Sequence, residues 1–120
     1  MALTQKRLVG PTQLTTTTST VLYTTPISTT TIAKQIILCN TTGSAVTVTL
    51  ALKPLNVAQA TSHNFTSALS LAANETITIS TSLVLNNNGS TANATNSDQI
   101  IGYASSNTAV NIIVTGIEES

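Results

Sequence analysis

The chain has 120 residues, with four basic and four acidic side chains and a formal net charge of zero at pH 7. This length fits one domain, and a chain without net charge offers no electrostatic attraction for nucleic acid or an anionic membrane. No apolar run is long enough to span a bilayer, and the N-terminus lacks the apolar block of a signal peptide, so Sec export is not expected.

The composition is polar but uncharged. Thr, Ser and Asn make up two fifths of the chain, and the aromatic residues are two Tyr and one Phe. A surface with so few charges is weakly protected against self-association. The core must be built from Ile, Leu and Val, so we expect a domain of modest stability that gains part of that stability from partner contacts.

Residues 1–18 show no sustained hydrophobic period and contain the breaker dipeptide Gly10-Pro11. We interpret them as an extended N-terminal arm, with residues 19–120 as the folded domain; a frayed terminus is the alternative. Aliphatic and basic side chains in the arm are the predicted partner-binding residues, namely Leu3, Lys6, Arg7, Leu8, Val9 and Leu14.

The next segments read as β-strands. A short strand over 20–24 is stopped by Pro26. Residues 31–52 are predicted to form a central hairpin, because apolar residues alternate on both sides of the turn-forming segment 40–44. Lys53-Pro54 ends this hairpin.

Further strands are expected over 68–71, 76–85, 99–104 and 109–117, with a bulge at 80–82 that changes the face of the third-last strand. Two loops separate them, over 55–67 and 86–97, the first with a helical turn and the second exposed and mobile. Seven or eight short strands predict an all-β fold, an antiparallel β-sandwich of the jelly-roll or immunoglobulin-like kind with an extended N-terminal arm.

No catalytic constellation is found. His63 is the single histidine, and neighbouring serines are expected by chance in so hydroxyl-rich a chain. Glu75 and Asp98 show no reason to converge as an acid/base pair. Cys39 is interpreted as a buried small hydrophobe. We therefore predict no enzyme activity, no cofactor and no metal site.

Five Asn-x-Ser/Thr sequons occur, at Asn40, Asn64, Asn74, Asn88 and Asn93. Composition alone produces most of them, so we interpret them as coincidence. The Asn- and Ser-rich loops suit carbohydrate or protein contact, although a plain solvated loop is the simpler interpretation.

The termini carry opposite charges. Lys6-Arg7 lies near the beginning, and Glu118-Glu119 lies near the end. In an oligomer the arm of one subunit could meet the tail of the next, which makes Glu118 and Glu119 candidate inter-subunit partners. Exposed pairs contribute only about 0–1 kcal/mol each, so they would set register more than affinity.

Four segments of the chain resemble a group of small virion proteins of tailed bacteriophages. They are MALTQKRLVGPTQLTTTTSTVLYTTP, ILCNTTGSAVTVTLALKP, LSLAANETITISTSLVL and NIIVTGIEE. The resemblance covers most of the chain and includes no catalytic motif. It implies a β-sandwich structural protein repeated on a virion that is assembled in the host cytoplasm.

The leading hypothesis is a capsid decoration (cement) protein. Its arm would lie on the major capsid protein, and its sandwich would associate with copies of itself, as a trimer. The alternative is a tail, neck or fibre component whose loops 55–67 and 86–97 contact the host surface. A weaker third option is an adhesin or pilin-like module, which the missing export signal disfavours.

Overall fold

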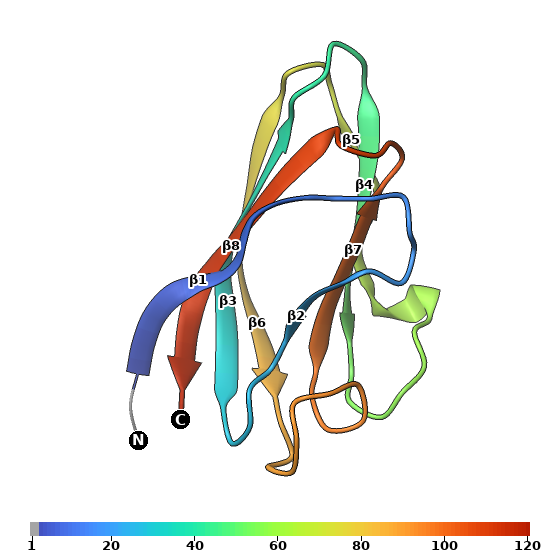
Figure 1. Ribbon diagram of the computed structural model, residues 1–120. Helices are drawn as coiled ribbons and strands as arrows, with labels where there is room; N and C mark the ends of the chain where they lie inside the picture. Colours follow the sequence, from blue (N-terminus) through green and yellow to red (C-terminus); the bar gives the residue numbers. More distant parts are fainter. Residues whose placement is uncertain (1–2) are drawn as a thin grey trace.

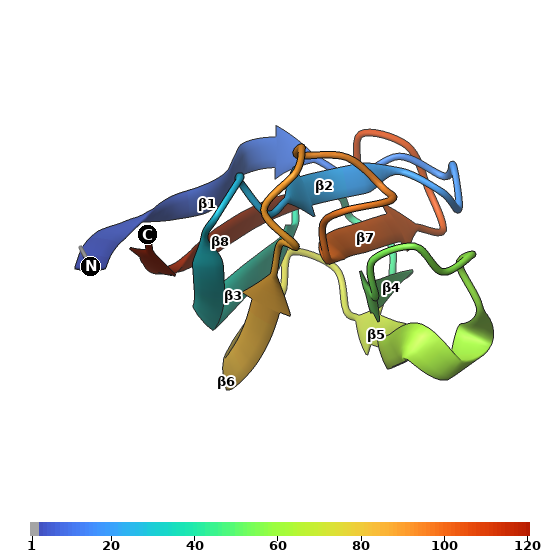
Figure 2. The ribbon, with the colours of Figure 1, turned by 90° about the horizontal axis from the view of Figure 1, so that it is seen from below.

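The computed structural model describes residues 3–120, which form two four-stranded antiparallel sheets packed face to face (Figures 1 and 2). The predicted β-sandwich is confirmed. The first sheet, sheet A, has the strand order β1-β8-β3-β6, and the second, sheet B, has the order β2-β7-β4-β5. The strands of sheet A are β1 (Leu3–Gln13), β8 (Val110–Glu119), β3 (Thr30–Asn40) and β6 (Thr76–Asn86). Those of sheet B are β2 (Val21–Thr24), β7 (Gln99–Ala104), β4 (Val46–Lys53) and β5 (Asn64–Leu71), and the 3-10 turn η1 (Thr61–His63) precedes β5.

The connectivity decides between the two expected topologies. β1 pairs with β8, β2 with β7, β3 with β6 and β4 with β5, all antiparallel. The chain is therefore a long hairpin folded over on itself, with each successive pair further from the termini. This nested pairing is that of a jelly roll, and Leu3 of β1 lies beside Glu119 of β8 in sheet A (Figure 1).

One connection differs from the prediction. β3 and β4 do not form a hairpin, because β3 lies in sheet A and β4 lies in sheet B. The segment between them crosses from one sheet to the other, and the fully buried Asn40 secures the crossing. Its amide nitrogen donates to the carbonyl oxygens of Ser44 and Ala72 at 2.8 and 3.0 Å, and its amide oxygen accepts the Thr42 backbone N–H at 2.9 Å.

The expected arm is not separate from the sandwich. Residues 3–13 pair with β8 from Leu3 opposite Glu119 to Gln13 opposite Asn111, with register shifts around Gly10-Pro11. Nine of the eleven residues of β1 are exposed and its two covered residues, Leu8 and Val9, are consecutive, so no alternation identifies it as a strand. The acidic tail is likewise part of β8 rather than a free segment. Met1 and Ala2, which the predicted arm included, lie outside the described residues.

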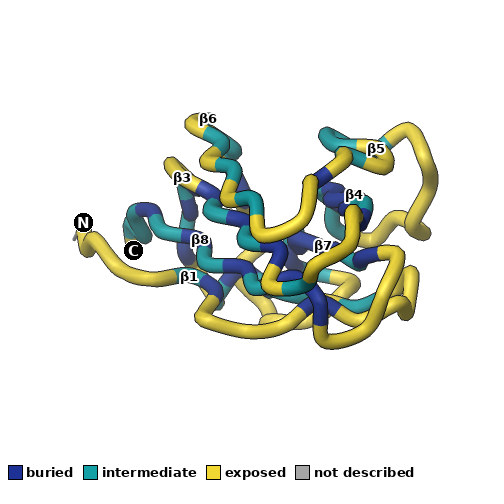
Figure 3. The backbone as a smooth tube through the Cα atoms, turned by 90° about the horizontal axis from the view of Figure 1, so that it is seen from above, coloured by how far each residue is buried: buried dark blue, intermediate teal, exposed yellow. Residues whose placement is uncertain are grey.

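The core between the sheets is built from aliphatic residues, as the composition requires. Figure 3 marks the buried residues along the backbone. Fully buried examples come from both layers: Ile36, Leu38, Ile112 and Val114 from sheet A, and Val48, Leu50, Leu71 and Ile100 from sheet B. The register shift expected near 80–82 is present opposite Lys34. The expected change of face is wrong, because odd-numbered residues remain the less exposed ones along all of β6.

Candidate interaction surface

The outer face of sheet A, turned away from sheet B, carries an aliphatic row across three strands. Glu118 points inward, since it bonds to Tyr23 of sheet B, so the neighbours Ile117 and Glu119 point outward. Ile117 lies opposite Ile32, and Ile32 lies opposite Val84 on the edge strand β6. We call Ile117, Ile32 and Val84 the apolar row. Val84 is 51% exposed, and Ile32 and Ile117 are partly exposed. The solvent face of an antiparallel sheet is ordinarily polar, so this row is a candidate contact surface.

The basic residues gather beside the apolar row. A shallow groove of about 530 Å³ is lined by Lys6 and Arg7 of β1, Lys34 of β3, and Thr115 and Ile117 of β8. Three of the four basic residues of the chain therefore meet here, the fourth being Lys53. Arg7 and Lys34 flank Thr115, because Arg7 lies opposite Thr115 on one side and the Lys34–Gln35 irregularity lies opposite it on the other. We call Arg7, Thr115 and Lys34 the basic row.

The acidic end of the same face lies on the other side of the apolar row. Glu119 pairs with Leu3 of β1 and with Thr30 of β3. We call Leu3, Glu119 and Thr30 the acidic row. The face thus presents a basic, an apolar and an acidic row in succession, each two residues further along β8.

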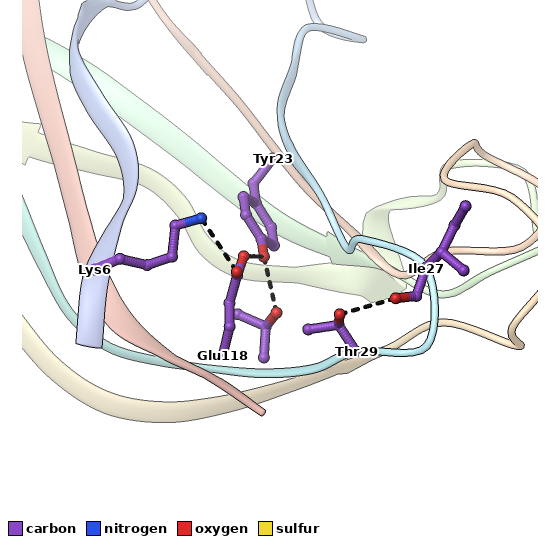
Figure 4. A network of polar contacts seen from close by, with 6 residues as sticks. Lys6, Tyr23, Ile27, Thr29 and Glu118 are labelled. Carbon is purple, nitrogen blue, oxygen red and sulfur yellow. Dashed lines mark hydrogen bonds and ion pairs between the residues drawn. The ribbon is translucent and has the colours of Figure 1, made fainter. Parts of the chain in front are cut away.

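A polar network links the two sheets just beneath this face (Figure 4). The Tyr23 hydroxyl donates to Glu118 Oε2 at 2.5 Å and lies 2.8 Å from the Thr31 hydroxyl oxygen. Glu118 Oε1 in turn accepts from Lys6 Nζ at 3.1 Å. Burial, reinforced by the carboxylate of Glu118, raises the pKa of Tyr23 well above its ordinary value. The network holds β8 against β2 and keeps the end of the sandwich closed.

The predicted arm residues divide into two groups. Leu3 is 68% exposed and Arg7 is exposed, so both are available to a partner. Val9 and Leu14 are buried in the core of their own chain, and Leu8 packs against that core. Val9 and Leu14 are therefore not available to a partner. Leu8 is only partly buried, and the Lys6 side chain is 46% exposed, so their role toward a partner stays a prediction.

The predicted acidic partners also differ from each other. Glu118 forms its ion pair with Lys6 of the same chain, where a pair between subunits was expected. Glu119 stays available, and its proposed role toward a neighbouring subunit stays a prediction. The apolar row was missed because the apolar residues of 31–52 were interpreted only as evidence for a central hairpin.

Other candidate residues are placed without forming a reactive site. Cys39 is partly exposed on β3 rather than buried as expected. His63 Nδ1 accepts the Ala60 backbone N–H at 3.2 Å in η1. Within residues 3–120 there is no group of three His, Cys, Asp or Glu residues suited to hold a metal ion. The sequon residue Asn40 is fully buried. None of the helical segments described is long and apolar enough to cross a membrane.

The two long loops meet at one end of the sandwich (Figure 1). The Asn56 backbone N–H donates to the Ala94 carbonyl at 3.0 Å, and the Leu55 N–H donates to Asp98 Oδ1 at 2.9 Å. Within the second loop, Asn87 and Asn93 side chains hold the backbone through short-range hydrogen bonds, such as Gly89 N–H to Asn87 Oδ1 at 2.6 Å. The strand β5 begins at Asn64, so the first loop is shorter than the expected 55–67.

Comparison with known proteins does not assign this chain to a family. No protein-family model matches the chain, and no curated protein matches it. Among solved structures, it is similar to the coat protein of tobacco streak virus, taken from the structure of a dimer of that protein. The TM-score is 0.43 at 11% identity, with 97% of this chain and 82% of the coat protein covered. The proposals below depend instead on the topology and the surface of this chain.

Proposed function

We propose that this chain is a non-enzymatic structural protein of a virion and, within that class, a bacteriophage capsid decoration (cement) protein. The observation that carries the proposal is the apolar row on the outer face of sheet A. Jelly-roll sandwiches occur in viral capsids, lectins and cupins, so the fold leaves the role open. The surface favours the first class, because an exposed aliphatic row between charged rows suits contact with another folded subunit.

In this proposal the N-terminal segment attaches to the shell as the edge strand β1 rather than as a free arm. Its outer edge has no strand partner among residues 3–120, and an unpaired edge can accept a strand from a neighbouring protein. Leu3 projects beside it at 68% exposure. The partners would be the major capsid protein and copies of the chain itself, for which a trimer was expected, with no nucleic acid or membrane involved.

Particle binding tests this proposal. Purified protein is added to capsids that lack it, and bound protein is measured after sedimentation; imaging of decorated particles then locates it. We expect binding to the shell and an increased temperature of capsid disruption. Leu3→Asp should weaken binding at least tenfold, whereas Val57→Asp, which alters a 45% exposed valine in the β4–β5 loop, should not. Density on the tail with a bare shell would contradict the decoration role.

The alternative, a tail, neck or fibre component that contacts the host surface, is favoured by the joined loops. The hydrogen bonds between residues 55–56 and 94–98 hold both loops in one arrangement before any ligand binds, which lowers the ordering cost of binding. Replacing exposed Asn88 and Ser90 by Ala should then reduce adsorption to host cells while leaving particle assembly intact. Unchanged adsorption would remove this alternative.

A further inference from the structure

We propose that the outer face of sheet A is a two-fold interface between copies of this chain, in which Glu119 of each copy enters the basic groove of the other. The proposal rests on the proposed function only in taking self-association as part of it. It names the surface and the geometry, and it makes the dimer the basic unit in place of the expected trimer.

The order of the three rows makes the face self-complementary. Along β8 the basic row, the apolar row and the acidic row are centred on Thr115, Ile117 and Glu119. Each step of two residues is about 7 Å along the strand. A two-fold axis that runs across the strands along the apolar row exchanges the rows on its two sides. It therefore places the acidic row of each copy over the basic row of the other.

The strand order fixes which side chains meet. Such an axis lays β8 over β8 of the second copy, so Glu119 of one copy faces Thr115 of the other. Arg7 and Lys34 lie one strand away on either side, about 5 Å from that point. The carboxylate therefore enters the groove between two cations, and the apolar rows of both copies cover each other at the centre.

The groove lacks a carboxylate of its own. Lys6 is held by Glu118 beneath the face, whereas within residues 3–120 no carboxylate forms an ion pair with Arg7 or Lys34. Lys34 Nζ reaches only the Ser82 hydroxyl, at 3.4 Å. Two cations therefore face a shallow apolar-floored groove without a counter-charge, and Glu119 of a second copy supplies one.

A shifted axis is disfavoured by the same charges. Centring the axis on the basic row would bury more aliphatic surface, because Ile113 and Ile37 would then face Ile117 and Ile32. It would also bring Arg7 and Lys34 over the same residues of the second copy. Like charges placed together in an interface are strongly unfavourable, so the axis along the apolar row is preferred.

This geometry leaves the hydrogen-bonding edge of β1 free, although Leu3, in the acidic row, lies over Arg7 of the second copy. Because the axis runs across the strands, β1 of one copy lies over β1 of the other, and both outer edges of β1 face the same side of the dimer. The dimer therefore offers two β1 edges on one side, running in opposite directions, for strand pairing to a shell. The apolar row is buried without using the edge that the proposed function requires.

Charge reversal with rescue tests the proposal on the purified chain. We expect a dimer by analytical ultracentrifugation. Glu119→Lys, and separately Arg7→Glu with Lys34→Glu, should each raise the dissociation constant at least tenfold. Combining the three substitutions should restore it to within a few-fold of the original, because the charges are exchanged rather than lost. Val84→Asp should dissociate the dimer, and Val21→Asp, at a 45% exposed valine on the β2 edge of sheet B, is its control.

Cross-linking locates the axis. In a Cys39→Ser background, single cysteines at Ile113, Thr115 and Ile117 are treated with a short bis-maleimide. The yield should be highest at 117, where the two copies of the residue face each other across sheets about 10 Å apart. Position 113 should give the least, because its copies would lie roughly 27 Å apart along the strands.

The possible outcomes separate this proposal from the proposed function. A monomer, a trimer, failure of the charge rescue, or a maximum of cross-linking at 113 or 115 would overturn the two-fold interface. Circular dichroism of every variant confirms that the fold is retained, and a variant that does not fold is replaced by Glu119→Gln, which removes only the charge. The particle-binding measurement is independent, so protein found on the shell as a monomer would reject the dimer and keep the decoration role.

Discussion

Tyr23 shows how one hydroxyl group connects two layers of a sandwich. Its ring lies in the core on β2, and its hydroxyl reaches Glu118 on β8 and Thr31 on β3. The Glu118 side chain is only 15% exposed, so the interactions of its carboxylate are mainly with groups inside the protein. These groups are the Tyr23 hydroxyl and the Lys6 ammonium. A hydrogen bond to a charged group contributes more to stability than one between neutral groups.

Tyr23→Phe removes that donor while keeping the ring. We expect the free energy of unfolding at pH 7 to fall by about 1.5–3 kcal/mol, the range for a hydrogen bond to a charged group. Urea denaturation followed by circular dichroism measures the change. Tyr103→Phe, on the neighbouring strand β7, is the matched control and should change stability less. Equal losses in the two variants would show that the Glu118 contact contributes nothing.

The raised pKa of Tyr23 also predicts a pH dependence. Burial favours the neutral phenol in the folded state, so the stabilisation is complete below the unfolded-state pKa of about 10. As pH rises beyond that value, the unfolded chain loses the Tyr23 proton while the folded protein keeps it, and stability falls. Tyr23→Phe removes this source of pH dependence, so the stability difference between the two proteins should shrink between pH 9 and 11. A constant difference would contradict the assignment.

Asn40 provides a second test, at the crossing between the sheets. Asn40→Ala should destabilise the fold by about 1–3 kcal/mol or more, because buried backbone carbonyls lose their donor. Asn40→Asp should cost more at neutral pH, because a carboxylate would face the Ser44 and Ala72 carbonyl oxygens that the amide nitrogen now contacts. Denaturation midpoints of both variants check the order. A smaller cost for Asp than for Ala would contradict it.

For single residues, the hard part to predict was which chain would cover an aliphatic side chain. Val9 and Leu14 were expected to be covered by a partner, but their own core buries them, and Leu8 is partly buried against that core. From the sequence we can expect an aliphatic side chain to be covered, but we cannot tell whether its own chain or a partner covers it. Arg7 and Lys34 are 27 positions apart, and their meeting across Thr115 depends on strand pairing that no local pattern reveals.

At the scale of elements, residues 3–13 form the edge strand β1 of sheet A, where a removable arm was expected. An arm could be deleted without harm, but β1 covers one edge of β8 and contributes Val9 to the core. Deletion of residues 1–13 should therefore abolish cooperative thermal unfolding or lower the midpoint by more than 10 °C, given that each kcal/mol is worth about 4–8 °C in a small domain. Deletion of residues 1–3 is the control and should leave the transition nearly unchanged. If the chain lacking residues 1–13 were fully stable, residues 1–13 would be a dispensable arm, and this prediction would be wrong.

Alternation located seven of the eight strands, since period-two patterning follows directly from a sheet with one buried face. It did not identify their partners. The segment between β3 and β4 has the polar turn residues of a hairpin, yet it crosses between sheets, because the same local chemistry serves both connections. β1 was not recognised because most of its residues are exposed and the sequence shows no alternation there. Local sequence patterns therefore placed most residues of the candidate surface on strands, but they did not predict which of these residues lie side by side.

At the scale of the whole molecule, the nested pairing makes folding non-local. Leu3 must find Glu119 at the far end of the chain, whereas β4 and β5 are neighbours in sequence. Chains dominated by distant pairings fold in milliseconds to seconds, and we expect this range or slower. Leu71→Ala on β5 should mainly slow folding, and Val9→Ala on β1 should mainly speed unfolding, if the β4–β5 pair forms first. Stopped-flow kinetics measure both rates, and the reverse pattern would contradict this order.

The pairing of the first strand with the last also decides how the protein responds to force. Both chain ends leave the sandwich side by side, and β1 and β8 run antiparallel from that point. A pull applied between the two ends would load their hydrogen bonds one after another, as a zipper is opened, instead of straining all of them at once. A tether at the ends is therefore the weakest way to load this molecule, and contacts through the broad faces of its sheets would resist the same force better.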